Sequence, residues 1–267
     1  MTPATAQTPD TAGRAGRVVR ALVLPALLLL ALELWARTVG ASSDALAAPS
    51  AAATALATAL RDGAVWEATR FTLGSAALGL ALASALGVAL GTLLGLSPRA
   101  ARAGFVTIEV LRPVPSVALV PLAMLVFGFG LRMEVGVITF ACTWPMLLLT
   151  QAAVRQVEPQ WLEVARLLQL SPWARFVHMV WPAIVPRLFV ALRLATAIAL
   201  VVAVTVEIAA NPHGMGYALV IAQQSLDPAL MLGWLFWIGV VGYGLNLLTL
   251  RAQQHVAWRM GERGGAA

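Results

Sequence analysis

Nucleophiles and metal ligands are sparse in this sequence of 267 residues. The single cysteine, Cys142, stands inside an apolar run, and the three histidines, His178, His213 and His255, are far apart. A metal site on a helix needs ligands about one turn apart, and these residues form no such pair. The sequence also has no Ser/His pair and no pair of carboxylates that would suggest catalysis. We therefore expect neither a metal site nor catalytic residues in this chain.

The cationic side chains add a second exclusion, because all eighteen are arginine. The loop that cradles nucleotide phosphates, Gly-x-x-x-x-Gly-Lys-Ser/Thr, needs a lysine, so the chain cannot itself be a P-loop ATPase. We expect it to bind no cofactor. If ATP drives its work, ATP and magnesium must be held by a partner subunit.

One polar stretch, residues 158–172, lies between two apolar runs and has the pattern of a short amphipathic helix. Glu163, Arg166 and Gln169 recur at helical spacing on its polar flank, and Pro172 ends the helix. Its apolar flank is formed by Leu162, Ala165, Leu168 and Leu170. A helix of this kind can lie across a membrane surface with its side in the groove of another protein. The stretch is therefore a candidate for partner binding.

The composition indicates an integral membrane protein: 60% of the residues are hydrophobic, 11% are charged, and the mean hydropathy is +0.83. A bilayer core of ~30 Å needs ~20 mainly apolar residues per helix. Runs of this kind occupy residues 22–38, 71–96, 114–129, 135–154, 184–208 and 229–250. They are continuous rather than alternating, so the predicted fold is all-α, a polytopic bundle of about six transmembrane helices.

The arginines predict the orientation, because cytoplasmic loops of membrane proteins are enriched in cations. Those that fall on one side of the predicted spans are Arg14, Arg17, Arg20, Arg99, Arg102, Arg112, Arg155, Arg166, Arg175, Arg187, Arg251, Arg259 and Arg263. We predict that both termini are cytoplasmic. This asymmetry also explains the net charge of +6, so no nucleic-acid partner is expected.

The predicted organisation has a disordered cytoplasmic N-terminus at 1–20 and a first transmembrane helix at 21–39. A core domain follows at 66–255, and a cytoplasmic tail at 256–267 ends the chain.

One motif in the chain reads Glu163-Val164-Ala165, then Gln169, then Met179-Val180-Trp181-Pro182. It resembles the coupling motif, Glu-Ala-Ala, then Gly, then Ile-x-Leu-Pro, of the permease subunits of bacterial binding-protein-dependent ABC importers. The runs 91–97, 111–122 and 127–130 look like the nitrate, sulfonate and taurine branch of the family. The resemblance covers roughly residues 69–259.

The resemblance implies a type I ABC importer permease fold with a cytoplasmic coupling helix at 158–172, in the bacterial inner membrane. The residues implied to contact the ATPase are Glu163, Val164, Ala165, Arg166, Leu168, Gln169, Leu170, Ser171 and Pro172. The implied partners are a second copy of the chain, ABC ATPase subunits and a periplasmic or lipid-anchored solute-binding protein. The implied substrate is a small anion of the sulfonate, taurine or nitrate type. A pyrimidine-type precursor and an ion-coupled secondary transporter are the alternatives.

One position departs from the coupling motif, since Gln169 stands where the family has glycine. A non-glycine residue in a left-handed turn costs ~1 kcal/mol. We expect either continued helix or a mildly strained turn there.

Candidates for a transport path are breaks and polar residues within the spans. Pro113, Pro115 and Pro121 break the third span around Ser116, and a broken helix at membrane depth is typical beside a water-filled pathway. A stripe of small residues on the second span, from Gly79 to Gly95, is expected to pack closely against a neighbouring helix.

Three further pathway candidates lie in the last third of the chain. Arg193 is expected to be an inner-half anchor or an interhelical partner, and Glu207 to snorkel to the outer interface. Gln223 follows a segment, 211–217, that resembles a Gly-Leu-Gly-Tyr turn of the family. The helix that this turn opens would line an outer gate.

Overall fold

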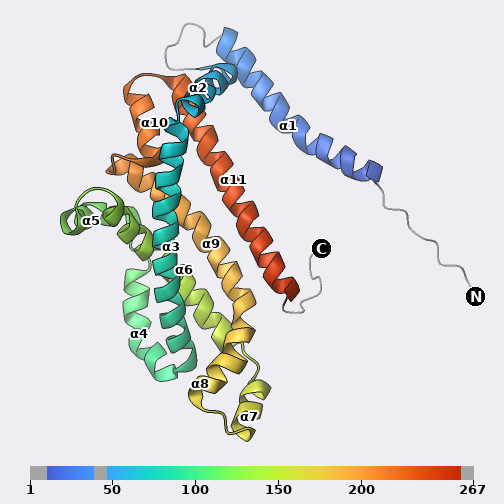
Figure 1. Cartoon of the computed structure of the whole chain (residues 1–267), viewed down its shortest axis with the longest axis vertical. Helices are drawn as coiled ribbons and strands as arrows, with labels where there is room; N and C mark the ends of the chain where they lie inside the picture. The colour runs from blue at the N-terminus through green and yellow to red at the C-terminus, as the bar shows by residue number, and fades with distance from the viewer. Residues whose placement is uncertain (1–10, 39–46, 260–267) are drawn as a thin grey trace, which may run out of the picture.

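The computed structural model describes residues 11–38 and 47–259 (Figure 1). Helices dominate the described part of the chain, and no strand occurs within it. The helices are α1 (Thr11–Thr38), α2 (Pro49–Arg61), α3 (Ala64–Leu96), α4 (Pro98–Leu111), η2 (Ser116–Leu119), α5 (Val120–Phe127), α6 (Leu131–Arg155), α7 (Pro159–Leu167), α8 (Pro172–Arg175), η3 (Phe176–Val180), α9 (Trp181–Ala209), α10 (Gly214–Gln224) and α11 (Pro228–Arg259).

Four helices within the described ranges are long and apolar enough to cross a membrane. They are α3, α6, α11 and the continuous helix 173–209, in which α8 and the π-helical turn η3 lead into α9. A fifth span is formed if α4 and the segment 116–127 are taken together as one bent pair. The first predicted span falls on α1, a helix of 28 residues. The protein is therefore a multi-pass membrane protein built of helices.

The third predicted span, 114–129, is wrong in its limits. The chain instead turns directly from α3 into α4, and α4 runs back beside the lower half of α3 (Figure 1). Pro113 and Pro115 then end α4, since proline cannot continue the hydrogen-bond ladder, and the next segment leaves at 84°. Arg112, which the sequence placed in a cytoplasmic loop, is the C-cap of α4.

The stripe of small residues on α3 packs against α6, as predicted. A Cβ atom added to Gly87 would lie 2.5 Å from the Cβ atom of Met146, and one added to Gly91 would lie 2.5 Å from the Leu147 carbonyl. The two helices run parallel here, with Gly79 beside Ile138. Only a residue without a side chain permits this approach.

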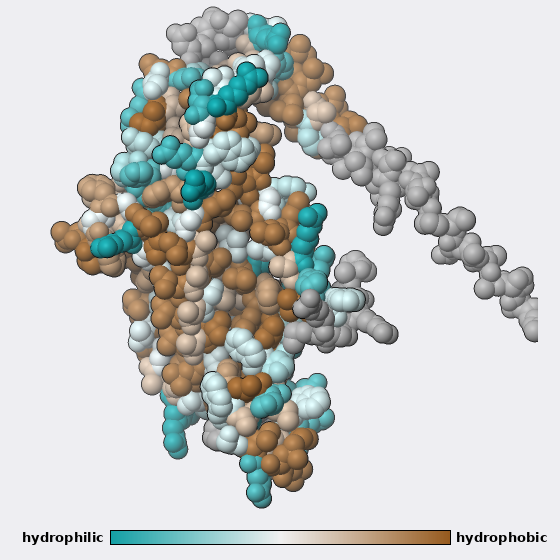
Figure 2. Space-filling view, in the orientation of Figure 1, coloured by the Kyte–Doolittle hydropathy of each residue, from teal (hydrophilic) through white to brown (hydrophobic). Residues whose placement is uncertain are grey.

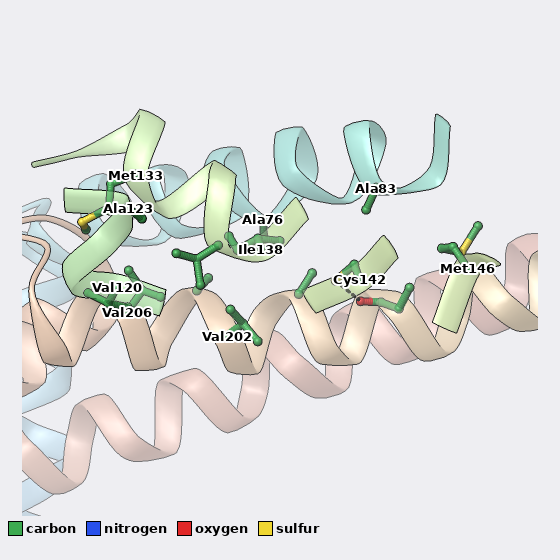
Figure 3. Packing of buried hydrophobic residues seen from close by; sticks show 14 of the residues in the cluster. Ala76, Ala83, Val120, Ala123, Met133, Ile138, Cys142, Met146, Val202 and Val206 are labelled. Carbon is green, nitrogen blue, oxygen red and sulfur yellow. Dashed lines mark hydrogen bonds between the residues drawn. The ribbon is translucent and has the colours of Figure 1, made fainter. Parts of the chain in front are cut away.

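The core lies where α3 and α6 meet α9 (Figure 3). It contains Ala83, Ile138 and Met146, all at most 2% exposed. The Cys142 thiol donates to the Ala195 carbonyl of α9 at 3.4 Å. Small alanines on α9 let it lie close to α6, so these helices form the rigid centre of the bundle.

Two features near the N-terminus differ from expectation. α1 begins at Thr11, earlier than the predicted residue 21, and residues 11–20 contain no proline that would stop the helix from extending. α2 was not predicted, and it packs on α11. Residues 1–10, 39–46 and 260–267 lie outside the described part of the chain, so the predictions made for them stay untested.

Candidate coupling and transport sites

The candidate coupling residues lie in the α7–α8 segment, residues 159–175, at one end of the bundle (Figure 1). α7 ends in a Schellman motif: the Leu170 N–H donates to the Ala165 carbonyl at 3.0 Å, and Gln169 has φ 51°. Gln169 thus occupies the left-handed position at which glycine is preferred. Of the two expectations for this turn, the strained one is correct.

Ser171 and Pro172 begin the next helix, so the prediction that Pro172 ends the coupling helix is wrong: α7 ends at Leu167. The Ser171 hydroxyl accepts a hydrogen bond from the Ala174 N–H at 3.2 Å, and the Ser171 carbonyl accepts one from the Arg175 N–H at 2.9 Å. Ser171 is therefore an N-cap, and Pro172 takes the first helical position, where its missing N–H has no cost.

Apolar side chains are exposed on the α7–α8 segment. Hydrophobic and hydrophilic residues lie next to one another at this end of the molecule (Figure 2). Leu167 is 83% exposed, Trp173 is 73% exposed, and Leu168 and Trp161 are more than half exposed. Of the predicted coupling residues, Glu163, Val164 and Gln169 are exposed as well, while Ala165 is buried. The side chains of Arg166 and Pro172 lie outside the described part.

The predicted pathway residues lie in separate places rather than at one site. Pro113, Pro115, Ser116 and Pro121 cluster at the break between α4 and α5.

Arg193 is elsewhere, in a groove of about 160 Å³ between α9 and α11, where its Nε donates to the Asn246 side-chain oxygen at 3.1 Å. This hydrogen bond links α9 to α11, as expected of an interhelical partner, and a role of Arg193 in a transport path stays a prediction. Gln223 is exposed near the end of α10.

Glu207 does not snorkel to the interface, because its side chain is 1% exposed. It belongs to a carboxylate cluster that was not predicted from the sequence, made of Thr72, Ser75, Glu134, Glu207 and Asn211, all at most 1% exposed. Glu134 accepts hydrogen bonds from the Ser75 hydroxyl and the Asn211 amide. Glu207 accepts one from Thr72 at 2.6 Å and one from the Gly216 N–H at 2.8 Å. The signal in the sequence was the recurrence of hydroxyl residues one turn apart on α3.

The carboxylate cluster fixes the start of α10. The Glu207 carboxylate receives the Gly216 N–H, and the Thr72 hydroxyl receives the Met215 N–H at 3.0 Å, so two of the free N–H groups of the helix are satisfied. A Cβ atom at Gly214, whose φ is 92°, would collide with the Glu207 carboxylate. The Gly-Met-Gly spacing of the turn is thus required by the close approach of α10 to α9.

A cavity of about 430 Å³ opens beside α10, at the end of α3 away from the α7–α8 segment. Glu67, Phe71 and Tyr217 line part of it, and His213 stacks on Phe71 with ring centroids 5.0 Å apart. The molecule therefore has two different ends: an apolar tip at α7–α8, and a hollowed, partly polar end at α10.

A family match covers most of the residues just described. The model of the family described as binding-protein-dependent transport system inner membrane component matches residues 83–262. This stretch begins in α3 and contains the α4–α5 break, the α7–α8 segment, Glu134 and Glu207.

Curated relatives agree with that match. The nitrate import permease protein NrtB of Synechococcus elongatus is 29% identical over 67% of this chain and 65% of NrtB. The aliphatic sulfonates transport permease protein SsuC of Escherichia coli, named as putative, is 30% identical over 70% of this chain and 71% of SsuC. The riboflavin transport system permease protein RibX of Chloroflexus aurantiacus is 31% identical over 86% of this chain and 87% of RibX.

A solved structure shares the fold. The methionine ABC transporter MetNI, in an inward-facing conformation, contains a chain that superposes with a TM-score of 0.62 at 15% identity, over 69% of this chain and 92% of the other. At this identity the similarity concerns the fold alone. Together with the family match over 83–262, it places the protein in a known class: the chain belongs to the family of binding-protein-dependent transport system inner membrane components.

Proposed function

We propose that this chain is the pore-forming permease subunit of an ATP-driven ABC importer for a small anion, in which a pair of permeases alternates between inward-facing and outward-facing states. The observation that carries the proposal is the exposed apolar tip of the α7–α8 segment. Apolar side chains at the aqueous end of a membrane bundle are stable when a partner covers them. In this family, that partner is the ATPase.

The work of this subunit is conformational rather than chemical. ATP and magnesium are assigned to the ATPase, and this chain contributes residues 158–172 as the coupling element, with Glu163 on its exposed flank. Closure of an ATPase pair would draw two α7–α8 segments together and shift the equilibrium of the bundle toward the outward-facing state.

The orientation follows from the same assignment. The α7–α8 end lies in the cytoplasm, which agrees with the arginines placed there, and both termini are cytoplasmic in the inner membrane. The opposite end, with the cavity beside α10, receives the solute-binding protein. Gln223, Pro121 and Ser116 would lie along the route between the two ends.

A small oxyanion is the substrate class that we favour, with an aliphatic sulfonate first. The support is the names of two relatives, which specify nitrate and aliphatic sulfonates. The relative named for riboflavin transport keeps an aromatic substrate as the alternative. An ion-coupled secondary transporter is disfavoured, because both buried carboxylates are already bonded to hydroxyl, amide and backbone donors.

A pull-down of the tagged chain from its host membranes in mild detergent, followed by mass spectrometry, tests the proposal. Recovery of an ATPase together with a solute-binding protein would support it, and the binding protein could then be screened against nitrate, sulfonates and riboflavin. Recovery of the chain alone, with uptake that survives ATP depletion and stops when an ion gradient is removed, would overturn it.

A further inference from the structure

The C-terminal end of α4 carries two charged side chains about half way along the length of the bundle. α4 starts directly after α3 and runs antiparallel to it, since a Cβ atom on Gly104 would lie 3.5 Å from the Leu94 side chain. At a rise of about 1.5 Å per residue, Arg112 lies ~20 Å from the turn at Pro98. The hydrocarbon core is ~30 Å thick, so Arg112 and its neighbour Glu109 are at membrane depth.

The packing of α3 on α6 places Arg112 at the same depth in the membrane. Counting back from the Gly104–Leu94 contact puts Arg112 about level with Leu86 on α3. Gly87 in turn contacts Met146, near the middle of α6. Arg112 is therefore about half way along a helix that spans the membrane.

This pair of charges lies open at the surface of the single chain. The side chains of Arg112 and Glu109 are 47% and 46% exposed, and their nearest charged atoms, Nη2 and Oε2, are 3.6 Å apart. The two intramembrane carboxylates of the carboxylate cluster, by contrast, are buried and fully engaged. Charges at this depth are stable only toward a water-filled cavity or a protein partner, because lipid cannot solvate them.

The backbone beside the pair supports the same conclusion. Pro113 and Pro115 end α4 directly after Arg112, and Pro113 has no N–H to offer the Glu109 carbonyl. A break of this kind at membrane depth is tolerated where it is buried in protein or lines water. The described part of the chain leaves the charged side chains next to the break uncovered, which fits a water-filled space.

We propose that Arg112 is an anion-binding residue of the transport pathway, with Glu109 as the group that it pairs with when no substrate is present. The proposal rests on the proposed function and adds to it a side chain that recognises the substrate. A guanidinium stays charged in proteins and offers parallel N–H donors that match an oxyanion such as nitrate, bicarbonate or a sulfonate. A half-exposed pair at 3.6 Å is weak, so an arriving oxyanion displaces the Glu109 carboxylate at little cost, and the carboxylate takes its place again when the anion leaves.

Access of water to Arg112 can be measured without knowing the substrate. Cys142, the one native cysteine, is buried and is replaced by alanine. In that background, Arg112→Cys in membranes is treated with a membrane-impermeant methanethiosulfonate, and full modification is defined after denaturation in detergent. Modification of the thiol in most of the protein molecules, as for the exposed control Arg99→Cys at the start of the same helix, supports the proposal. A thiol that reacts only after denaturation overturns it.

Anion recognition is tested in proteoliposomes that contain the full complex, using nitrate, bicarbonate and methanesulfonate as probes. Arg112→Gln should lower uptake of the transported anion by about tenfold or more, and Arg112→Lys should lower it less. Arg99→Gln, which makes the same charge change outside the pathway, should stay within about twofold. ATP hydrolysis should persist in all three variants.

Glu109→Gln separates anion binding from a structural ion pair. If Arg112 binds substrate, Glu109→Gln removes the carboxylate that competes with the anion, so the KM of uptake should fall, whereas Arg112→Gln should raise it. Equal loss in Glu109→Gln and Arg112→Gln would overturn the proposal, as would normal uptake in Arg112→Gln. Failure of the wild-type complex to take up any of the three anions would instead remove the proposed substrate class, and this proposal with it.

Discussion

The carboxylate cluster and the α7–α8 segment invert the usual relation between residue type and location. The cluster places Glu134 and Glu207 in the interior of an apolar bundle, each at most 1% exposed. The α7–α8 segment places Leu167 and Trp173 at an aqueous end, each more than 70% exposed. In the cluster, every carboxylate has donors within the chain, whereas the apolar tip has no cover within the described part of the chain. The difference separates residues that hold the chain together from residues that, in the proposed function, are covered by another protein.

The largest expected effect is a loss of stability when a residue of the carboxylate cluster is replaced. Glu134→Ala leaves the Ser75 hydroxyl and the Asn211 amide without their acceptor, and a buried polar group without a partner costs about 1–3 kcal/mol. With the cavity that is created, we expect a loss of about 3–5 kcal/mol in folding free energy. Thermal unfolding followed by size-exclusion chromatography in detergent measures it. Glu67→Ala, at an exposed position on α3, serves as the control and should leave the unfolding temperature almost unchanged.

The packing of α3 on α6 gives the next effect. Gly87→Ala would place a Cβ atom 2.5 Å from that of Met146, and forcing helices apart costs about 1–3 kcal/mol. Gly74→Ala on the same helix has nothing within 4 Å of the added atom, and should be neutral or slightly stabilising. Equal unfolding temperatures for the two variants would contradict the observed contact between α3 and α6.

Substitutions at the α7–α8 tip should change the binding of the ATPase and leave the stability of the chain unchanged. Leu167→Glu puts a charge on the exposed apolar surface, and we expect recovery of the ATPase to fall by about tenfold or more while the unfolding temperature stays the same. Leu226 offers a matched control, because it is 85% exposed at the opposite end of the bundle, compared with 83% for Leu167. Leu226→Glu should leave ATPase recovery unchanged. If both variants lost the ATPase alike, the tip would have no special role.

The smallest effect concerns the turn after α7. Gln169 has φ 51°, and glycine relieves the strain of this conformation, so Gln169→Gly should stabilise the segment by about 1 kcal/mol. Gln160→Gly, in the first turn of α7, should destabilise it by about 0.5–1 kcal/mol, since glycine loses more backbone freedom on folding. Hydrogen exchange of the α7–α8 amides would detect both changes. Slower exchange in Gln160→Gly than in Gln169→Gly would contradict the assignment of the turn.

The bundle could be predicted from the sequence because continuous apolar runs leave the backbone one solution in lipid, the helix. The α7–α8 segment could be predicted in part. Glu163 and its neighbours mark an amphipathic helix, but this helix ends at Leu167, and Pro172 begins α8. The position of the family's glycine left two possibilities for Gln169, continued helix or a strained turn, and the structure has the turn. These features depend on local sequence, which a single chain displays in full.

Features that depend on which helices meet could not be predicted. Glu207 looked like a residue at the end of a span, and only the convergence of α3, α6, α9 and α10 shows that it is buried with Glu134. The predicted third span begins too late in the sequence. α4 is amphipathic and carries Arg102, Glu109 and Arg112, so it was interpreted as a loop. The proposed role of Arg112 therefore came from the structure, whereas the candidate residues Arg193 and Pro113 came from the sequence.

The central claim, that the α7–α8 tip receives an ATPase, is tested most directly by photocrosslinking in native membranes. A benzophenone amino acid is placed at Trp161, which is 53% exposed on α7, and, as a control, at Trp66, which is 56% exposed at the other end of the bundle. We predict that position 161 crosslinks to a protein whose peptides contain a phosphate-binding loop, and that position 66 does not. Capture of no protein at position 161, or capture of the same ATPase at both positions, would contradict the account.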